Sequence, residues 1–342
     1  MSTIPFTLHK RPSRKTLFVS DIHGSQPDLE ARLNQIAGSK RPPKTVFFLG
    51  DVAGTQSLLE LQHVFYNLIV NPAKKLFTQK PNPSDNEILH FPTEDKDSPR
   101  ILDGCRKLWH ILNSIDPSYS AGYCPDIVRD LITFTHYDHW ISNLPESIKN
   151  VLKKDLFTNA ERIYQIMEKF TNRGTLVVII EGNWDARLPI DFVADRKNCL
   201  PIAPQDRDFY FKKFITDKQN RDIIYVDHLH YLQIYEGIQM VLIPFDAIMK
   251  YDGYPIWKRE DIQKTVLITH TQVSWEAIKD NTVMTGEGKK IKGNIQRILQ
   301  NLQPNAVIHG HLHNSISYQG YALTNGTLVH YLPIGTARFI DF

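Results

Sequence analysis

Five short apolar segments along the chain each end in glycine or in a polar residue. Within each segment the apolar residues are consecutive rather than alternating with polar ones. This pattern predicts strands that are buried on both faces, as in parallel sheets covered by helices. The segments span residues 16–21, 44–51, 175–183, 264–270 and 305–311.

Helical patterns lie between these predicted strands. The segment Pro27–Ala37 begins with a proline and is followed by Gly38, which is typical of the start and end of a helix. A second helix is expected at 288–302, where one stripe is apolar. Beyond residue 222 short strand patterns return, and Asn325-Gly326 predicts a hairpin turn. Strands alternating with helices predict an α/β fold.

The middle of the chain breaks this pattern. Five prolines and ten charged residues fall within 71–100, which predicts a loop or a partly ordered segment. Helical patterns dominate from 101 to 170. We therefore expect a core formed by 1–70 and 173–342 and interrupted by a mostly helical insertion at 71–172.

Composition and charge exclude several classes of protein. The 342 residues are 42% hydrophobic and 23% charged, which argues against a disordered, collagenous or coiled-coil chain. A net charge of +3 is too small to indicate a nucleic-acid partner by itself. Three widely spaced cysteines favour neither a disulfide framework nor a zinc ribbon and are typical of reduced thiols. No apolar run reaches the length of a membrane span, so a cytoplasmic location without membrane contact is expected.

Polar residues of metal-binding type follow the predicted strands. Because the carboxyl ends of strands in an α/β sheet meet at one crevice, we expect these side chains to converge. Carboxylate and imidazole groups are ligands that manganese, iron and zinc accept. The candidates are numerous enough for two metals that share a bridging carboxylate: Asp21, His23, Asp51, Asn183, His270, His311 and His313.

Together these residues form a series of motifs: Asp21-Ile-His23, Gly50-Asp51, Gly182-Asn183-Trp184-Asp185, His270 and Gly310-His311-Leu-His313. Over about residues 16–55 and 173–340 the series resembles that of the calcineurin-like metallophosphoesterases. The resemblance implies a two-sheet β-sandwich flanked by helices, with two divalent ions, of which manganese is favoured over iron, zinc or nickel. It also implies two groups of ligands joined by a bridging Asp51, namely Asp21, His23 and His313, and Asn183, His270 and His311.

The chain departs from the family pattern at Trp184, where most members carry a histidine that serves the leaving group. Asp51, Asn183 and Asp185 are the expected catalytic residues, and Asn183, Trp184 and Arg187 the expected substrate-binding residues. Trp184 either stacks on a nucleobase or packs under the insertion. Asp185, with no histidine to orient, is expected to cap a helix or to bond neighbouring groups. Other groups would have to supply a proton, the candidates being His136, His139, His228, His230 and His309.

The resemblance implies an enzyme that hydrolyses a phosphodiester by attack of a metal-bridging hydroxide, because the family's diesterases include motifs without this histidine. The alternatives are hydrolysis of a phosphomonoester or a nucleotide pyrophosphate, and a metal-binding scaffold without turnover. The expected partner is a phosphate-ester substrate, with nucleotides and nucleic acids among the candidates. The insertion is expected to form a cap over the site or the interface of a homo-oligomer.

Overall fold

A computed structural model of the chain describes residues 6–7, 16–24, 26–64, 98–118, 144–186, 211–258, 262–271, 273, 286–311, 319–323 and 326–341. Most of the proline-rich segment lies outside these residues, as do His136, His139, Arg187, His313 and Asn325. The chain forms two compact units. The first comprises Met1–Ala53, Ala160–Ala186 and Phe211–Phe342, and the second comprises Gly54–Asn159 and Arg187–Tyr210. The division into a core and an insertion at 71–172 stays a prediction.

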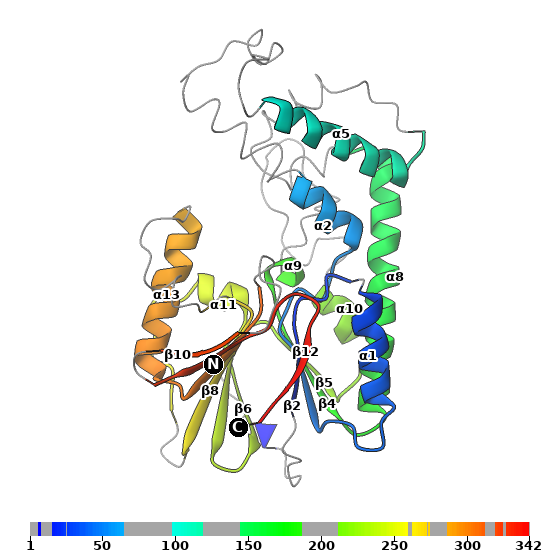
Figure 1. Ribbon diagram of the computed structural model, residues 1–342. Coiled ribbons are helices and arrows are strands. Elements are labelled where there is room, and N and C mark those ends of the chain that lie inside the picture. Colours follow the sequence, from blue (N-terminus) through cyan, green and yellow to red (C-terminus); the bar gives the residue numbers. More distant parts are fainter. Residues whose placement is uncertain are drawn as a thin grey trace. The chain divides into compact units, whose positions relative to one another are not determined.

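The first unit contains a seven-stranded sheet in the order β1-β6-β7-β8-β9-β11-β10 (Figure 1). Its β6–β7 and β10–β11 pairs are antiparallel, and its other pairs are parallel. The predicted hairpin is therefore confirmed in its two strands, β10 and β11. The strands are β1 (Phe6–Thr7), β6 (His230–Tyr235), β7 (Ile238–Ile243), β8 (Lys264–Thr269), β9 (Ala306–His309), β10 (Gln319–Ala322) and β11 (Leu328–Tyr331).

A five-stranded sheet in the order β12-β2-β3-β4-β5 belongs to the same unit. Only β12 is antiparallel to its neighbour. Its strands are β2 (Thr16–Val19), β3 (Thr45–Phe48), β4 (Leu176–Ile180), β5 (Ile223–Val226) and β12 (Ala337–Ile340). The fold class is thus confirmed in its coarse form, as an α/β protein with two mixed, mostly parallel sheets flanked by helices.

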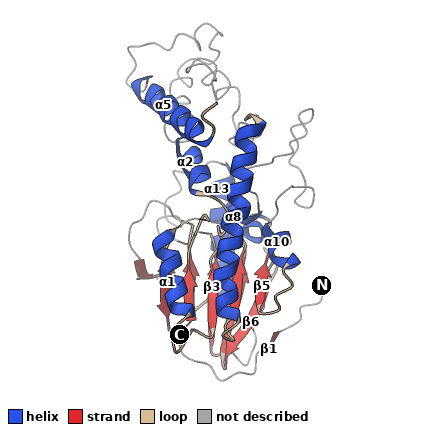
Figure 2. Cartoon of the chain, turned by 90° about the vertical axis from the view of Figure 1, so that its right-hand side faces the viewer, coloured by secondary structure: helices blue, strands red, loops and turns tan. Residues whose placement is uncertain are grey.

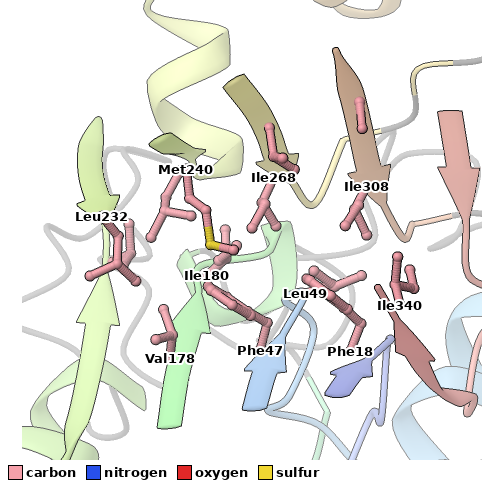
Figure 3. Close-up of a cluster of buried hydrophobic side chains, with 14 of the residues drawn as sticks. Phe18, Phe47, Leu49, Val178, Ile180, Leu232, Met240, Ile268, Ile308 and Ile340 are labelled. Atoms are coloured by element: carbon pink, nitrogen blue, oxygen red, sulfur yellow. The ribbon is translucent and has the colours of Figure 1, made fainter. Parts of the chain in front are cut away.

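Side chains from both sheets meet in one apolar core (Figure 3). On the five-stranded sheet, the rings of Phe18 and Phe47 stack with their centroids 5.1 Å apart. Met240 and Ile268 belong to the same cluster from the seven-stranded sheet. Every second residue of a strand reaches this core, because successive side chains of a strand point to opposite faces.

Helices cover the outer faces of the two sheets. Figure 2 shows α1 (Pro27–Ala37) and the C-terminal part of α8 (Glu146–Thr171) in front of the five-stranded sheet. The predicted helix at 27–37 is confirmed, with its proline in the first turn and Gly38 as its C-cap. On the seven-stranded sheet, α11 (Phe245–Met249) and α13 (Gly286–Leu302) pack against the outer apolar face. The short helices α9 (Asn183–Ala186) and α10 (Phe211–Asp217) complete this unit.

The second unit is helical where the structure describes it. It contains α2 (Gln56–His63), α5 (Ser98–Ile115) and the first part of α8. The Thr55 side chain caps α2 by accepting a hydrogen bond of 3.1 Å from the Leu58 amide. Among the described helices of the whole chain, none combines the length and the apolar character needed to cross a membrane.

Candidate metal centre

The described ligand candidates follow the carboxyl ends of five parallel strands. Asp21 and His23 follow β2, Asp51 follows β3 and Asn183 follows β4, all in the five-stranded sheet. His270 follows β8 and His311 follows β9 in the seven-stranded sheet. All are brought together, as the sequence predicted, and His313 lies outside the described residues.

Two overlapping triads form the centre of this cluster. Asp21, His23 and Asp51 make one triad, and Asp51, His270 and His311 make the other; within each, the ligand atoms lie within 4.8 Å of one another. Asp51 therefore belongs to both. All these side chains except His311 are buried. Two triads that share one carboxylate are compatible with a dinuclear metal site.

Two oxygen atoms that can accept hydrogen bonds, Asn183 Oδ1 and Asp51 Oδ2, lie close to Nε2 of His270, which is itself an acceptor when the ring is neutral. Its Nδ1 donates to the carbonyl oxygen of Leu49 over 2.8 Å, which leaves the Nε2 lone pair of the neutral ring facing the cluster. Nε2 lies 2.9 Å from Asn183 Oδ1 and 3.3 Å from Asp51 Oδ2. Such a group repels itself unless a proton or a cation sits among its members, so the donor set fits a metal ion.

Each of the two acidic ligands in the first triad has one oxygen fixed and one left open. Asp21 Oδ2 accepts hydrogen bonds from the Ser20 hydroxyl and from the His311 amide, the latter over 2.8 Å. Asp51 Oδ1 accepts from the Trp184 amide over 2.8 Å. The other oxygens, Asp21 Oδ1 and Asp51 Oδ2, are buried and accept no hydrogen bond from any described residue. Buried carboxylate oxygens need a partner, and a cation would supply it.

The backbone is strained where it carries the ligands. Asp21, His23, Asp51 and His311 have φ values of 35°, 45°, 48° and 76°. Such left-handed conformations cost non-glycine residues about 1 kcal/mol or more each, and they cluster at functional sites. Only two further described residues other than glycine have a positive φ. The strain is therefore concentrated at the cluster.

Two glycines allow the strand ends to approach one another. A Cβ on Gly182 would lie 2.3 Å from both the amide nitrogen and Oδ1 of Asp51. A Cβ on Gly50, whose φ is 96°, would lie 2.7 Å from His270 Nδ1. Neither position has room for a side chain, because a Cβ there would displace a candidate ligand.

The ionisation of the cluster is strongly perturbed. Burial raises the pKa of Asp21 to about 7, with the charge of Asp51 adding to the rise and His270 opposing it. Burial acts in the same direction on Asp51, but the neighbouring His270 outweighs it and holds the pKa of Asp51 below its usual value. For His270, burial lowers the pKa, yet Asp51 and Asp21 raise it to about 9. A bound cation would compete with the proton of this imidazole.

Asp185 and Trp184 lie beside the cluster in distinct roles. Asp185 is buried and accepts hydrogen bonds from the amides of Ala53 and Gly182 over 2.8 Å and 3.1 Å, so it ties together the loops that follow β3 and β4. Burial and the charge of Asp51 raise the pKa of Asp185 to about 7. Trp184 is only 2% exposed, and its indole meets the His23 ring edge to face. The catalytic and substrate-binding roles predicted for both residues stay predictions.

Three of the alternative proton donors, His228, His230 and His309, lie among the described residues and differ in their surroundings. The His228 side chain is 75% exposed and lies 2.7 Å from Asp227 Oδ1. His309 is fully buried, and burial lowers its pKa to about 4. The His230 pKa is also lowered by burial. His136, His139 and Arg187 lie outside the described residues.

Sequence reasoning missed the residues that hold the ligands. Ser20 bonds both Asp21 and the carbonyl oxygen of Leu332, and Leu49 orients His270 through its own carbonyl. Phe245 places its ring 6.3 Å from that of His270. The adjacency of Ser20 to Asp21 is the only signal of these contacts in the sequence; the others depend on packing between distant segments.

Comparisons of the chain with protein-family models, with curated proteins and with solved structures found no significant match. The likeness to the calcineurin-like family therefore stays a resemblance of motifs. What the structure adds is the convergence of those motifs into buried histidine and aspartate groups that could hold metal ions.

Proposed function

We propose that this protein is a phosphoesterase that depends on two divalent metal ions and hydrolyses a phosphodiester bond. One observation carries the proposal: the two buried triads overlap in a single carboxylate, Asp51. A divalent ion in each triad would polarise the phosphate oxygens and generate a nucleophile from water near neutral pH. Manganese is the favoured metal.

The candidate ligands fall into two groups, one for each proposed metal ion. Asp21 and His23 supply ligands on one side, and His270 and His311 on the other, with Asp51 shared. The Asn183 amide oxygen lies against His270 Nε2 and so joins the second group. His313 is proposed as a further ligand on the side of Asp21, from its place in the sequence motif.

A diester is favoured over a monoester because the family that the motifs resemble includes diesterases without a histidine at the position of Trp184. An indole has no proton to donate to a leaving group near neutral pH, whereas the usual histidine has one. Asp185, which would orient such a histidine, instead binds two main-chain amides. Esters whose leaving group departs without strong acid assistance are therefore the proposed substrates.

The test compares two aryl esters on one protein preparation. Metal-stripped protein is refilled with Mn²⁺ and assayed with bis-p-nitrophenyl phosphate and with p-nitrophenyl phosphate. We expect faster release from the diester and no release before refilling. Turnover of the monoester alone would replace the proposal with a phosphomonoesterase. Two bound ions with no turnover of either ester, or of nucleotide diesters and pyrophosphates, would indicate a scaffold.

A further inference from the structure

Residue 184 contacts a ligand of the candidate metal centre through its side chain. The ring centroids of Trp184 and His23 lie 4.7 Å apart with an interplanar angle of 79°, an edge-to-face arrangement. His23 is 1% exposed and has a strained backbone, with a φ of 45°. An imidazole in such a position needs a neighbour that fixes its ring plane, and an edge-to-face aromatic contact fixes it in both distance and angle.

The main chain of the same residue contacts a second ligand. The Trp184 amide donates to Asp51 Oδ1 over 2.8 Å. This bond leaves Asp51 Oδ2 directed at the cluster, 3.7 Å from His23 Nε2 and 3.3 Å from His270 Nε2. Trp184 thus touches the carboxylate that both triads share and a histidine that only one of them contains.

The burial of Trp184 argues against a direct contact with substrate. A nucleobase stacks on an aromatic residue only where one face of the ring is open. Trp184 is 2% exposed, whereas Trp257 in the same unit is 71% exposed. The indole therefore has no open face of the size that a base would need.

We propose that Trp184 is a positioning residue of the metal centre: its indole fixes the plane of the His23 ring while its amide fixes Asp51. The inference rests on the proposed metal site but not on the identity of the substrate. In this role the tryptophan contacts no substrate and acts by holding the His23 ring in its orientation.

The size of the effect follows from the aromatic contact. An edge-to-face aromatic pair stabilises its own geometry by more than the burial of its surface alone provides. Loss of the pair changes an equilibrium constant by roughly threefold to tenfold. Trp184→Leu removes the aromatic partner and keeps an apolar side chain. Trp184→Phe keeps a ring at the position. We expect Trp184→Leu to weaken one of the two metal-binding events by this factor, and Trp184→Phe to recover most of the loss.

The test uses the full chain, stripped of metal and titrated with Mn²⁺ or Ni²⁺. Bound metal is measured by equilibrium dialysis, and tryptophan fluorescence is followed in parallel. Because a paramagnetic ion held by His23 would sit close to the indole, ion binding should quench part of the emission. Trp184→Phe should still bind ions but lose this quenching, and the matched control Trp257→Phe should keep it.

The outcomes separate the two proposals. Two bound ions with equal quenching in the wild type and in Trp184→Phe would overturn the positioning role and leave the metal centre intact. Unchanged affinities in Trp184→Leu would overturn it as well. A wild-type chain that binds no ion in dialysis would overturn both. If Trp184→Leu does not fold, Trp184→Met takes its place in the dialysis, and ion affinities equal to those of the wild type would overturn the positioning role.

Discussion

Replacing Asp51 by asparagine tests the bridging carboxylate with the smallest change in shape. The new side chain keeps an oxygen that can accept the Trp184 amide, which lies 2.8 Å from the present Oδ1. In place of Oδ2 it puts an amide group that carries no charge and does not bind a metal. Since Oδ2 lies 3.3 Å from His270 Nε2 and 3.7 Å from His23 Nε2, the substitution affects both triads at once.

The magnitude follows from the electrostatics of the buried site. Two unit charges 4 Å apart interact by about 4 kcal/mol at the effective dielectric constant of such positions. Removing one partner of a buried ion pair costs about 3–5 kcal/mol, which corresponds to a loss of affinity of roughly a hundredfold to several thousandfold. We expect Asp51→Asn to lose at least one ion and all phosphoesterase activity. In the metal-free protein the pKa of His270 should also fall, because Asp51 is the main group that raises it.

The assay is equilibrium dialysis against Mn²⁺, with the His270 imidazole followed by NMR during a pH titration of the metal-free protein. Asp217→Asn is the matched control, because the Asp217 side chain is 61% exposed and forms an ion pair with Lys213, four residues earlier on the same helix. Asp217→Asn should leave metal binding unchanged. Two ions bound by Asp51→Asn with wild-type affinity and full activity would refute the bridging assignment.

Three further predictions follow from the same site. Gly182→Ala should lower the free energy of unfolding by about 1–3 kcal/mol in urea, because its Cβ would lie 2.3 Å from the amide nitrogen of Asp51; Gly293→Ala in α13, where a Cβ meets no atom within 4 Å, should be neutral or stabilising. Chelation should lower the melting temperature and Mn²⁺ should restore it, with about 2.7 kcal/mol regained at a hundredfold excess over the dissociation constant; a melting temperature indifferent to both would count against a metal site. Trp184→His should give no gain in monoesterase activity, because residue 184 is buried against His23 rather than open to substrate; a folded variant with raised monoesterase activity would place residue 184 at the leaving group and contradict the positioning role.

Much of the architecture could be predicted from the sequence because the information is local. Consecutive apolar residues such as Val46, Phe47 and Phe48 of β3 indicated strands buried on both faces, and the polar residues after them marked the strand ends. Pro27 and Gly38 fixed the bounds of a helix for stereochemical reasons that need no tertiary contact. Parallel strands bring their carboxyl ends to one edge, so the convergence of Asp51 with Asn183 was expected once both were placed at strand ends; in the structure the two strands, β3 and β4, are parallel neighbours.

The remaining features depend on contacts between distant segments. Ser20 reaches the carbonyl oxygen of Leu332, 312 positions away, and no local pattern encodes that bond. The sequence showed that Trp184 replaces a histidine, but whether the indole faces the rim or His23 is decided by packing. The same holds for Asp185, whose two amide partners lie in different loops.

The cluster is costly for the fold unless a cation is bound. Asp21, Asp51 and Asp185 are buried together, and the charge of Asp51 raises the pKa of both of the others. Two of the ligand-bearing strand ends also carry left-handed backbone at aspartate, and Gly182 is held so close to Asp51 that no side chain fits. Unfavourable backbone conformations and buried, closely spaced carboxylates are concentrated at one edge of the sheets, whereas the strands themselves consist mainly of buried apolar residues. Such a concentration is expected of a functional site rather than of the core. A divalent ion would neutralise the carboxylates and satisfy their open oxygens at the same time, so a metal centre explains the strain, the burial and the perturbed pKa values together.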